Sequence, residues 1–321
     1  MNTVLSEIQK IGIVPTAVPD DARNILPLAD TLCKEGIPCV EIDFCDNLTC
    51  ESIHETAARF PQMIIGFGAV LTINQACSAI NAGADFIASP VFDPAVIQYC
   101  MNRNIPVIPR ISSSNHMETA LSLGLEAVSV LHDNLTDSIH MIQTMSRHYP
   151  SIKFMPEGSI CGKDMGSYLE PDHVIACFNN RIAKREWIQA GEFSRIGRLA
   201  KESVRDMMGF EVSHIGINCG SDENAEKTAG IFEAMFGFPK ESGPGSAYAG
   251  TFLECMKPPH LGTNGHIAIA ANSITRAKNY FEAIGYEFNE SSAKFNDGKM
   301  IVIYFKEEVG GFAVHIVQKQ Q

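Results

Sequence analysis

The sequence lacks the features that mark several specialised protein classes. Ten cysteines are spread along its 321 residues without a CxxC pair or a Cys/His finger spacing, so neither a zinc finger nor a disulfide framework is predicted. The N-terminus lacks a basic start followed by an apolar stretch, and no apolar run approaches the ~20 residues that a membrane span needs. We therefore expect a cytoplasmic protein with reduced thiols and no membrane partner.

Positive charge is also scarce. The chain has 25 Lys and Arg against 37 Asp and Glu, which gives a formal net charge of −12. An acidic surface repels phosphate backbones, so no nucleic-acid partner is expected. No glycine-rich phosphate turn follows the first apolar strand, so no nucleotide cofactor is expected. What the chain does have is 45% hydrophobic residues, enough to fill the cores of globular domains.

Residues 1–208 alternate short apolar runs with amphipathic segments. Near-continuous apolar strands that alternate with helices indicate a parallel sheet buried on both faces. Eight such units, beginning with a strand, predict an α/β domain that forms a (β/α)8 TIM barrel, with a doubly wound open sheet as the alternative. The predicted strands are Ile11–Val18, Cys39–Phe44, Met63–Ala69, Phe86–Ser89, Val107–Pro109, Ala127–Leu131, Lys153–Pro156 and Val174–Phe178.

Residues 209–321 follow a different pattern, which repeats after roughly 55 residues. Each half opens with a strand that carries His followed by alternating apolar residues, at His214 and His266. A helix then ends at a glycine followed by an aromatic residue, at Gly237 and Gly285, as a helix C-cap requires. Further strands follow, with Ala247–Met256 predicted as one strand in the first half. We expect an α+β domain.

The first domain resembles the 2-keto-3-deoxy-6-phosphogluconate (KDPG) and 4-hydroxy-2-oxoglutarate (KHG) aldolases, a family of aldehyde-lyases that commonly form trimers. The likeness rests on the order and spacing of motifs such as Ile13-Val14-Pro15, Val40-Glu41-Ile42, Ser89-Pro90, Ile105–Ser112 and Pro156–Ile160. It implies a homo-oligomer that binds a small molecule. It also implies that Glu41 is the general acid/base and that Ser89 and Pro90 contact substrate. Arg110 and Ser159 stand where the family has glycine, and we expect them to bind substrate as well.

The functional positions depart from that family. Ser129 stands where the resemblance places the Schiff-base lysine, Cys45 where it places an arginine that binds carboxylate, and Ala69 where it places a threonine. Serine cannot form an imine with a ketone, so the family reaction is not expected here. We expect Arg110 to pair with Glu41 or to fill the vacated pocket. Lys153 is an alternative source of an amine, although a surface lysine is the simpler interpretation.

The second domain resembles the vicinal oxygen chelate (VOC) superfamily, which includes the glyoxalases and pairs two βαβββ modules around a metal. The positions that match its ligands are His214, Glu254, His266 and His315, the last in place of a glutamate. The resemblance implies a divalent ion such as Zn, Ni, Fe or Mn, because imidazole and carboxylate suit these metals. Core histidines without metal are the alternative.

Three functions therefore stay open. The first is a metal-dependent enzyme whose second domain acts on a small oxo-acid or sugar-derived compound, with the barrel as ligand-binding or oligomeric scaffold. The second is a catalytically inactive ligand-binding or regulatory protein. The third is an active aldolase that uses Lys153 or a metal in place of the missing lysine.

Overall fold

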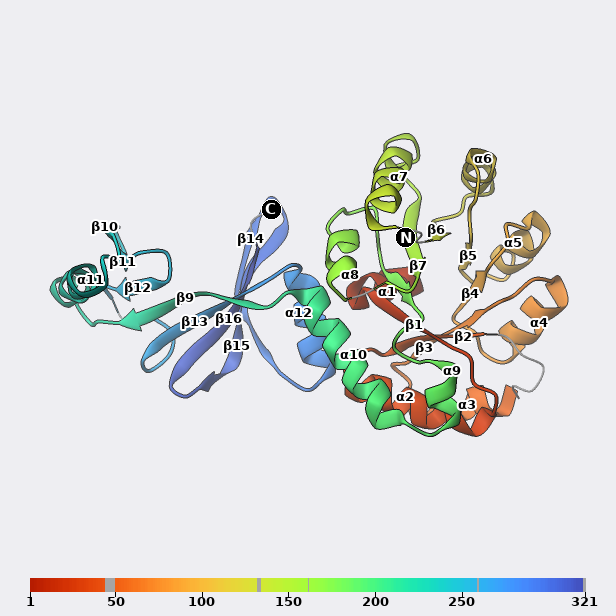
Figure 1. The fold of residues 1–321 in the computed structure, drawn as a ribbon, viewed down its shortest axis with the longest axis horizontal. Coiled ribbons are helices and arrows are strands. Elements are labelled where there is room, and N and C mark those ends of the chain that lie inside the picture. The colour runs from red at the N-terminus through yellow and green to blue at the C-terminus, as the bar shows by residue number, and fades with distance from the viewer. Residues whose placement is uncertain (44–49, 132–133, 161, 259, 320–321) are drawn as a thin grey trace. The chain divides into compact units, whose positions relative to one another are not determined.

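The computed structural model describes residues 1–43, 50–131, 134–160, 162–258 and 260–319. The chain divides into two units, Met1–Met207 and Met208–Gln321 (Figure 1). Each unit is built on one eight-stranded sheet, wholly parallel in the first and mixed in the second. The predicted fold class, a (β/α)8 barrel followed by a domain of paired βαβββ modules, is confirmed.

In the first unit the strands follow the order β5-β4-β3-β2-β1-β8-β7-β6. The two end strands meet where Arg110, just after β5, pairs with Ser129 in β6. There the Ile111 amide donates to the Ser129 carbonyl over 2.9 Å, so the sheet closes into a barrel. The strands are β1 Ile13–Ala17, β2 Cys39–Asp43, β3 Ile64–Gly68, β4 Phe86–Ser89, β5 Val107–Pro109, β6 Ala127–Leu131, β7 Lys153–Gly158 and β8 Cys177–Asn179.

Helices surround this barrel (Figure 1). Many of them begin at a residue whose side chain caps the helix. Thr72 and Gln75 form a capping box at the start of α4, and Asp93 caps α5 directly before Pro94. The helices are α1 Thr3–Ile11, η1 Ala22–Asn24, α2 Ile25–Lys34, α3 Cys50–Arg59, α4 Ile73–Asn81, α5 Pro94–Met101, α6 Ser114–Leu123, α7 Leu135–His148, α8 Gly162–Leu169, α9 Arg185–Gln189 and α10 Phe193–Met208.

The expectation that the barrel begins with a strand is wrong, because α1 precedes β1. Residues that favour the start and the end of a helix flank α1 in the sequence. The Asn2 side chain accepts from the Val4 amide, and Gly12 ends the helix in the left-handed conformation at φ 81°. The barrel core is aromatic in part, with Phe67, Phe86 and other rings almost fully buried.

The second unit consists of two βαβββ modules. Its strands follow the order β10-β11-β12-β9-β13-β16-β15-β14, so β9 and β13, the first strand of each module, lie together at the centre. The first module is β9 Glu211–Asn218, α11 Asp222–Phe236, β10 Lys240–Ser242, β11 Ser246–Ala249 and β12 Leu253–Met256. The second is β13 Gly265–Ala271, α12 Ile274–Ala283, β14 Phe288–Asn296, β15 Lys299–Val309 and β16 Phe312–Gln318.

Two strand predictions for this unit need correction. The segment Ala247–Met256 is an antiparallel hairpin of β11 and β12, which Gly250 turns at φ 63°. The strand β14 was not predicted, because its sequence Phe288–Asn296 is largely polar and exposed at the edge of the sheet.

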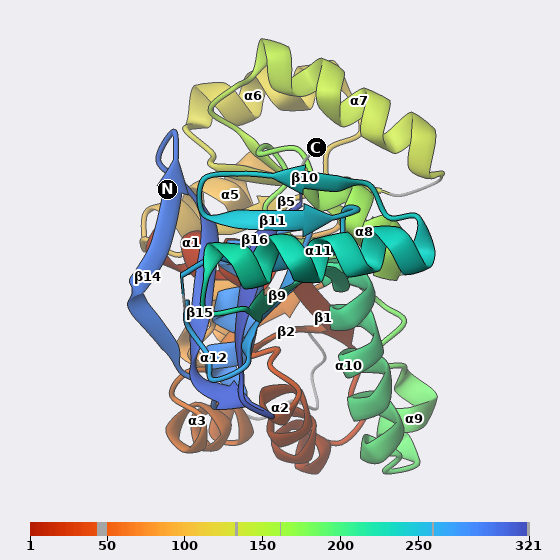
Figure 2. The same ribbon diagram turned by 90° about the vertical axis from the view of Figure 1, so that its left-hand side faces the viewer.

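Each helix of this unit packs on the strands of its own module. Helix α11 contacts β10, β11 and β12, and Figure 2 shows it lying along them, while α12 contacts β15 and β16. The core under α11 is made of small residues, namely Ala225, Ala229, Ala247, Ala249 and Cys255. No helix in the described part of the chain is both long and apolar enough to cross a membrane.

Candidate functional site

At the C-terminal ends of the barrel strands, two carboxyl groups of β2 lie against β3. Asp43 pairs with Gly68 across the two strands, and Glu41 is two residues earlier on the same face. A Cβ on Gly68 would lie 2.0 Å from Glu41 Oε1 and 2.8 Å from Asp43 Oδ1, so the glycine leaves the space that these groups occupy. Glu41 is only 8% exposed. Burial, then the charges of Asp43 and Glu157, raise the pKa of Glu41 to about 8.

Across the barrel, Arg110 binds Glu157 at the end of β7. The Arg110 Nη2 donates to Glu157 Oε2 over 3.0 Å, its Nε bonds the other carboxylate oxygen, and this pairing raises the pKa of Arg110. The Ser129 hydroxyl donates to Glu157 Oε1 over 3.2 Å. Arg110 thus lies beside Ser129, at the pocket that it was expected to fill. Its carboxylate partner is Glu157 and not Glu41.

Glu157 was missed in the sequence. The only signal was a carboxylate at the C-terminal end of a predicted barrel strand, the end where such folds build their sites. Its role depends on pairing with Arg110, which lies 47 residues away in the chain.

The other predicted barrel residues lie apart from this group. The Ser89 hydroxyl is 2.7 Å from the Val70 carbonyl oxygen and 2.9 Å from that of Val91, so it ties two loops together. Pro90 beside it is half-buried, and Ser159 is exposed and bonds Asn180. Cys45 lies outside the described residues.

Lys153 does not lie at the mouth of the barrel. It is level with Ala127 in the β6/β7 register, at the opposite end of β7 from Glu157. Its ammonium donates to the Asp172 carbonyl over 3.1 Å. An aldolase that uses Lys153 at the mouth of the barrel is therefore inconsistent with the structure.

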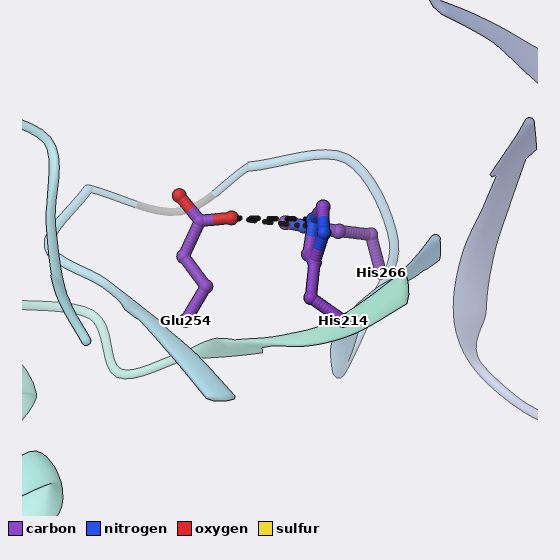
Figure 3. A group of neighbouring side chains, drawn as sticks. All are labelled: His214, Glu254 and His266. Carbon is purple, nitrogen blue, oxygen red and sulfur yellow. Dashed lines mark hydrogen bonds and ion pairs between the residues drawn. The ribbon is translucent and has the colours of Figure 1, made fainter. Parts of the chain in front are cut away.

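In the second unit, His214, Glu254 and His266 point toward one another from β9, β12 and β13 (Figure 3). The two Nε2 atoms are 3.1 Å apart, and Glu254 Oε2 is 3.5 Å from that of His214 and 3.3 Å from that of His266. We call these three residues the His–Glu–His cluster. A Cβ on Gly216 would lie 2.0 Å from His266 Cε1, so the glycine provides the room for this ring.

Strand register shows how the two modules share this site. Glu254 pairs with Gly216 and Tyr248, and His315 pairs with Ala268 and Tyr304, at equivalent positions of the two modules. Directly paired residues project on the same face of a sheet. One face therefore carries two equivalent sets of side chains, His214, Glu254 and Tyr248 from the first module and His266, His315 and Tyr304 from the second.

His315 lies beside the His–Glu–His cluster. Its ring centre is 5.2 Å from that of His266 and 5.5 Å from that of His214, so the structure brings three of the four predicted ligands together and leaves the fourth adjacent. The Nδ1 atoms of His315 and His266 are buried without a hydrogen-bond partner among the described residues. Such orphaned polar atoms are rare in proteins and need an explanation, and His173 Nδ1 in the barrel is a third one.

The surroundings shift the pKa of Glu254, His214 and the adjacent His315 toward the forms that coordinate metal ions. A hydrogen bond from His266, with others from Ser246 and Tyr248, lowers the pKa of Glu254 to about 2. Burial and the neighbouring histidines lower the pKa of His315 to about 3, and burial lowers that of His214. Ionised carboxylate and neutral imidazole are the forms that coordinate metal.

Comparison with known proteins places the barrel among aldolases. A family model described as KDPG and KHG aldolase matches residues 4–199. The 2-dehydro-3-deoxy-phosphogluconate aldolase of Haemophilus influenzae is 31% identical over 201 residues, 63% of this chain and 95% of that protein. The Treponema pallidum protein of the same name is 29% identical, over 64% and 98%.

A solved structure is similar as well. The KDPG aldolase of Legionella pneumophila, with pyruvate captured at low pH as a covalent carbinolamine intermediate, matches with a TM-score of 0.56 and 25% identity. The match covers 62% of this chain and 97% of that one.

Proposed function

The chain belongs to the KDPG and KHG aldolase family, and we propose that its barrel binds a small molecule without imine chemistry while the second domain holds a divalent metal ion. In this proposal the second domain is of the VOC type and acts on a small oxo-acid or sugar-derived compound. The homo-oligomeric state stays a prediction.

The barrel part of the proposal rests on Ser129 and its surroundings. A carbinolamine, like the one captured in the Legionella protein, contains an amine nitrogen bonded to the substrate carbonyl carbon. Here the hydroxyl of Ser129 bonds Glu157, and Lys153 lies at the other end of its strand. The cation bound to Glu157 is Arg110, whose guanidinium remains protonated and non-nucleophilic.

Borohydride trapping tests this part. The full chain is incubated with pyruvate and sodium borohydride, which reduces an imine to a stable amine, and its intact mass is measured. The Legionella aldolase serves as the positive control. We expect no adduct on this chain, and an adduct mapped to any lysine of the barrel would overturn the proposal.

The metal part rests on one observation, the mutual spacing of the His–Glu–His cluster. Ligand atoms bound about 2.1 Å from one ion, in tetrahedral or octahedral arrangement, lie roughly 3.0–3.4 Å apart. Two of the three separations, 3.1 and 3.3 Å, lie in this range, and the third, 3.5 Å between His214 Nε2 and Glu254 Oε2, is slightly longer. A divalent ion bound there would act as a Lewis acid toward a ligand oxygen. The Ser246 and Tyr248 hydroxyls, 2.6 and 3.0 Å from Glu254 Oε1, fix the carboxylate that would hold it.

Metal analysis tests this part. The purified chain is loaded with Zn²⁺, passed through a desalting column and analysed by mass spectrometry for metal content. We expect about one ion per chain, and a loss of most of it in the double variant His214→Ala/His266→Ala. The matched control is His54→Ala/His140→Ala, which removes two exposed barrel histidines. Equal metal in wild type and the cluster variant would refute the metal site.

A catalytically inactive binding protein is the second candidate, and the Arg110–Glu157 pair favours it for the barrel. The pair, with Ser129, satisfies much of the polar capacity beside the position of the lost lysine. If the metal analysis fails, this candidate becomes the better description of the whole protein.

A further inference from the structure

The two modules contribute unequally to the face that carries the His–Glu–His cluster. In the first module the Tyr248 hydroxyl donates to Glu254, so its bond supports the cluster itself. Its equivalent in the second module, Tyr304, instead stacks on His315 with ring centres 4.3 Å apart. The Tyr304 hydroxyl has no hydrogen bond to any described residue, although the side chain is only 6% exposed. The Tyr248 hydroxyl is therefore occupied by a hydrogen bond within the protein, whereas the Tyr304 hydroxyl keeps its hydrogen-bonding capacity.

A histidine lies next to this uncommitted hydroxyl. The ring centre of His260 is 5.8 Å from that of His266 and 6.1 Å from that of Tyr304. Asn218 holds its backbone on both sides, since the His260 amide donates to Asn218 Oδ1 over 3.0 Å and Asn218 Nδ2 is 3.2 Å from the His260 carbonyl oxygen. The loop between the modules is thus tied so that His260 stands over the second-module side of the cluster.

A positive charge faces the same place. Lys294 on β14 pairs with Val302 on β15, two residues before Tyr304, so it projects on the face of Tyr304. Lys294 forms no ion pair with a described residue, unlike Lys278 and Lys306 of the same domain.

A phenol, an imidazole and an ammonium on one side of a Lewis-acid site suit an anion. We propose that the second domain binds a small carboxylate whose anionic group is held by Tyr304, His260 and Lys294, with another of its oxygens directed to the His–Glu–His cluster. This inference rests on the proposed metal site and adds to it the charge of the ligand and the side on which it binds. The first-module side cannot hold the anionic group in this way, because the hydroxyls of Tyr248 and Ser246 are hydrogen-bonded to Glu254.

The test uses the full chain loaded with Co²⁺, whose visible absorption bands report on ligands at the metal and not on the barrel. Two probes share the keto group and differ in charge: pyruvate, an anion, and methyl pyruvate, its neutral ester, which is larger by one methyl group. We expect pyruvate to shift the bands and methyl pyruvate to bind at least about 10-fold more weakly. Inorganic phosphate is the third probe, and we expect it to bind more weakly than pyruvate.

Variants then assign the subsite. Tyr304→Phe keeps the stacked ring and removes only the hydroxyl, so we expect unchanged Co²⁺ bands and a pyruvate Kd raised about 10-fold or more. Lys294→Gln should raise the pyruvate Kd several-fold and reduce the salt dependence of that Kd. Tyr248→Phe should instead weaken Co²⁺ binding, because it removes a bond to Glu254. Tyr286→Phe, the same change at a side chain of which 56% is exposed, is the matched control.

The outcomes separate the two proposals. If the chain shows no Co²⁺ bands that depend on His214 and His266, both the metal site and this inference fail. If the bands are present but Tyr304→Phe binds pyruvate as tightly as wild type, or methyl pyruvate binds as tightly as pyruvate, the metal site stands and the carboxylate subsite is wrong. A tighter complex with phosphate than with pyruvate would also overturn the assignment to a carboxylate.

Discussion

The barrel and the second domain treat their polar side chains in opposite ways. At the barrel mouth a cation, a carboxylate and a hydroxyl, those of Arg110, Glu157 and Ser129, bond to one another. In the second domain, groups that coordinate metals converge on one point, and two imidazole nitrogens stay without a partner in the described part of the chain. Glu254 is hydrogen-bonded as well, so the second domain differs in its two buried nitrogens, His266 Nδ1 and His315 Nδ1, whose hydrogen-bonding capacity is unused among the described residues. This difference directs the search for chemistry to the second domain.

The two sites are also constructed differently. In the barrel, Arg110 and Glu157 lie at or just beyond the ends of parallel strands, whereas Ser129 and Glu41 lie within β6 and β2. In the second domain they lie within the strands β9, β12, β13 and β16, on one face of the sheet. A site within hydrogen-bonded strands has a fixed geometry. The loops of the barrel can change more readily, which is consistent with a barrel that keeps its fold while its mouth changes.

Glu41 is not part of the paired set of Arg110, Glu157 and Ser129. Among the substitutions that test the comparison of the two domains, the one at Glu41 has the largest expected effect. The pKa of Glu41, raised by burial to about 8, lies above the usual 4.5, so its contribution to stability is full below pH 4.5 and is lost as pH rises through 8. Glu41→Gln does not titrate and should therefore stabilise the barrel at pH 9, by at most about 5 kcal/mol, with little effect at pH 4.5.

The single tryptophan, Trp187 in α9, reports on the barrel alone, so urea unfolding followed by its fluorescence at both pH values measures this effect. Glu55→Gln, at an exposed position of α3, is the control. A gain for Glu41→Gln that is the same at both pH values would show that burial of the charge is not its cause.

A substitution at Gly216 tests whether the His266 ring in the second domain is a metal ligand. Gly216→Ala places a methyl group where the His266 ring stands, at 2.0 Å from Cε1, so the ring must move. We expect Zn²⁺ affinity, measured by competition with a chromogenic chelator, to fall about 100-fold, as other changes at metal sites do. The equivalent position of the second module is already alanine, Ala268, and Ala268→Gly is the matched control. Wild-type affinity in Gly216→Ala would show that the ring is not a ligand.

Glu157 tests whether the barrel mouth is held together by its own pairing. Glu157→Gln leaves the half-buried guanidinium of Arg110 without its charged partner, so we expect the free energy of unfolding to fall by about 1–2 kcal/mol in the Trp187 measurement. Arg110→Met in the same background should restore part of the loss, because it removes the unpaired charge. Asp30→Asn, which breaks the exposed Lys34 pair, should have a smaller effect. No difference between the two pairs would mean that the mouth is not stabilised in this way.

The sequence predicted the barrel better than the second domain, for a physical reason. Strands buried on both faces are continuous apolar runs, and three of them, Phe86–Ser89, Val107–Pro109 and Ala127–Leu131, have the predicted bounds. The edge strand β14 has one wet face and no partner on one side, so its polar sequence carries no such run. The hairpin at Gly250 was hidden because both of its arms are apolar.

The candidate sites were less predictable than the fold. His214, Glu254, His266 and His315 were found through a resemblance, since their separation in the chain reflects only the lengths of the elements between them. Glu157, Tyr304 and His260 acquire meaning only from partners brought close by folding. Arg110 was predicted near the vacated position, yet its partner could not be chosen among several carboxylates without the register of the strands.

The smallest expected effect belongs to a substitution at Ser129. Ser129→Ala removes one hydrogen bond to Glu157 Oε1, which is 3.2 Å long, so we expect a loss of about 1 kcal/mol in the unfolding of the barrel. If that bond is the role of the hydroxyl, the loss should shrink in the Glu157→Gln background, where the acceptor is no longer charged. An undiminished loss in that background would mean that Ser129 acts through the packing of β6 and not through Glu157. The polar groups at the barrel mouth would then be less completely bonded to one another than the comparison with the second domain assumes.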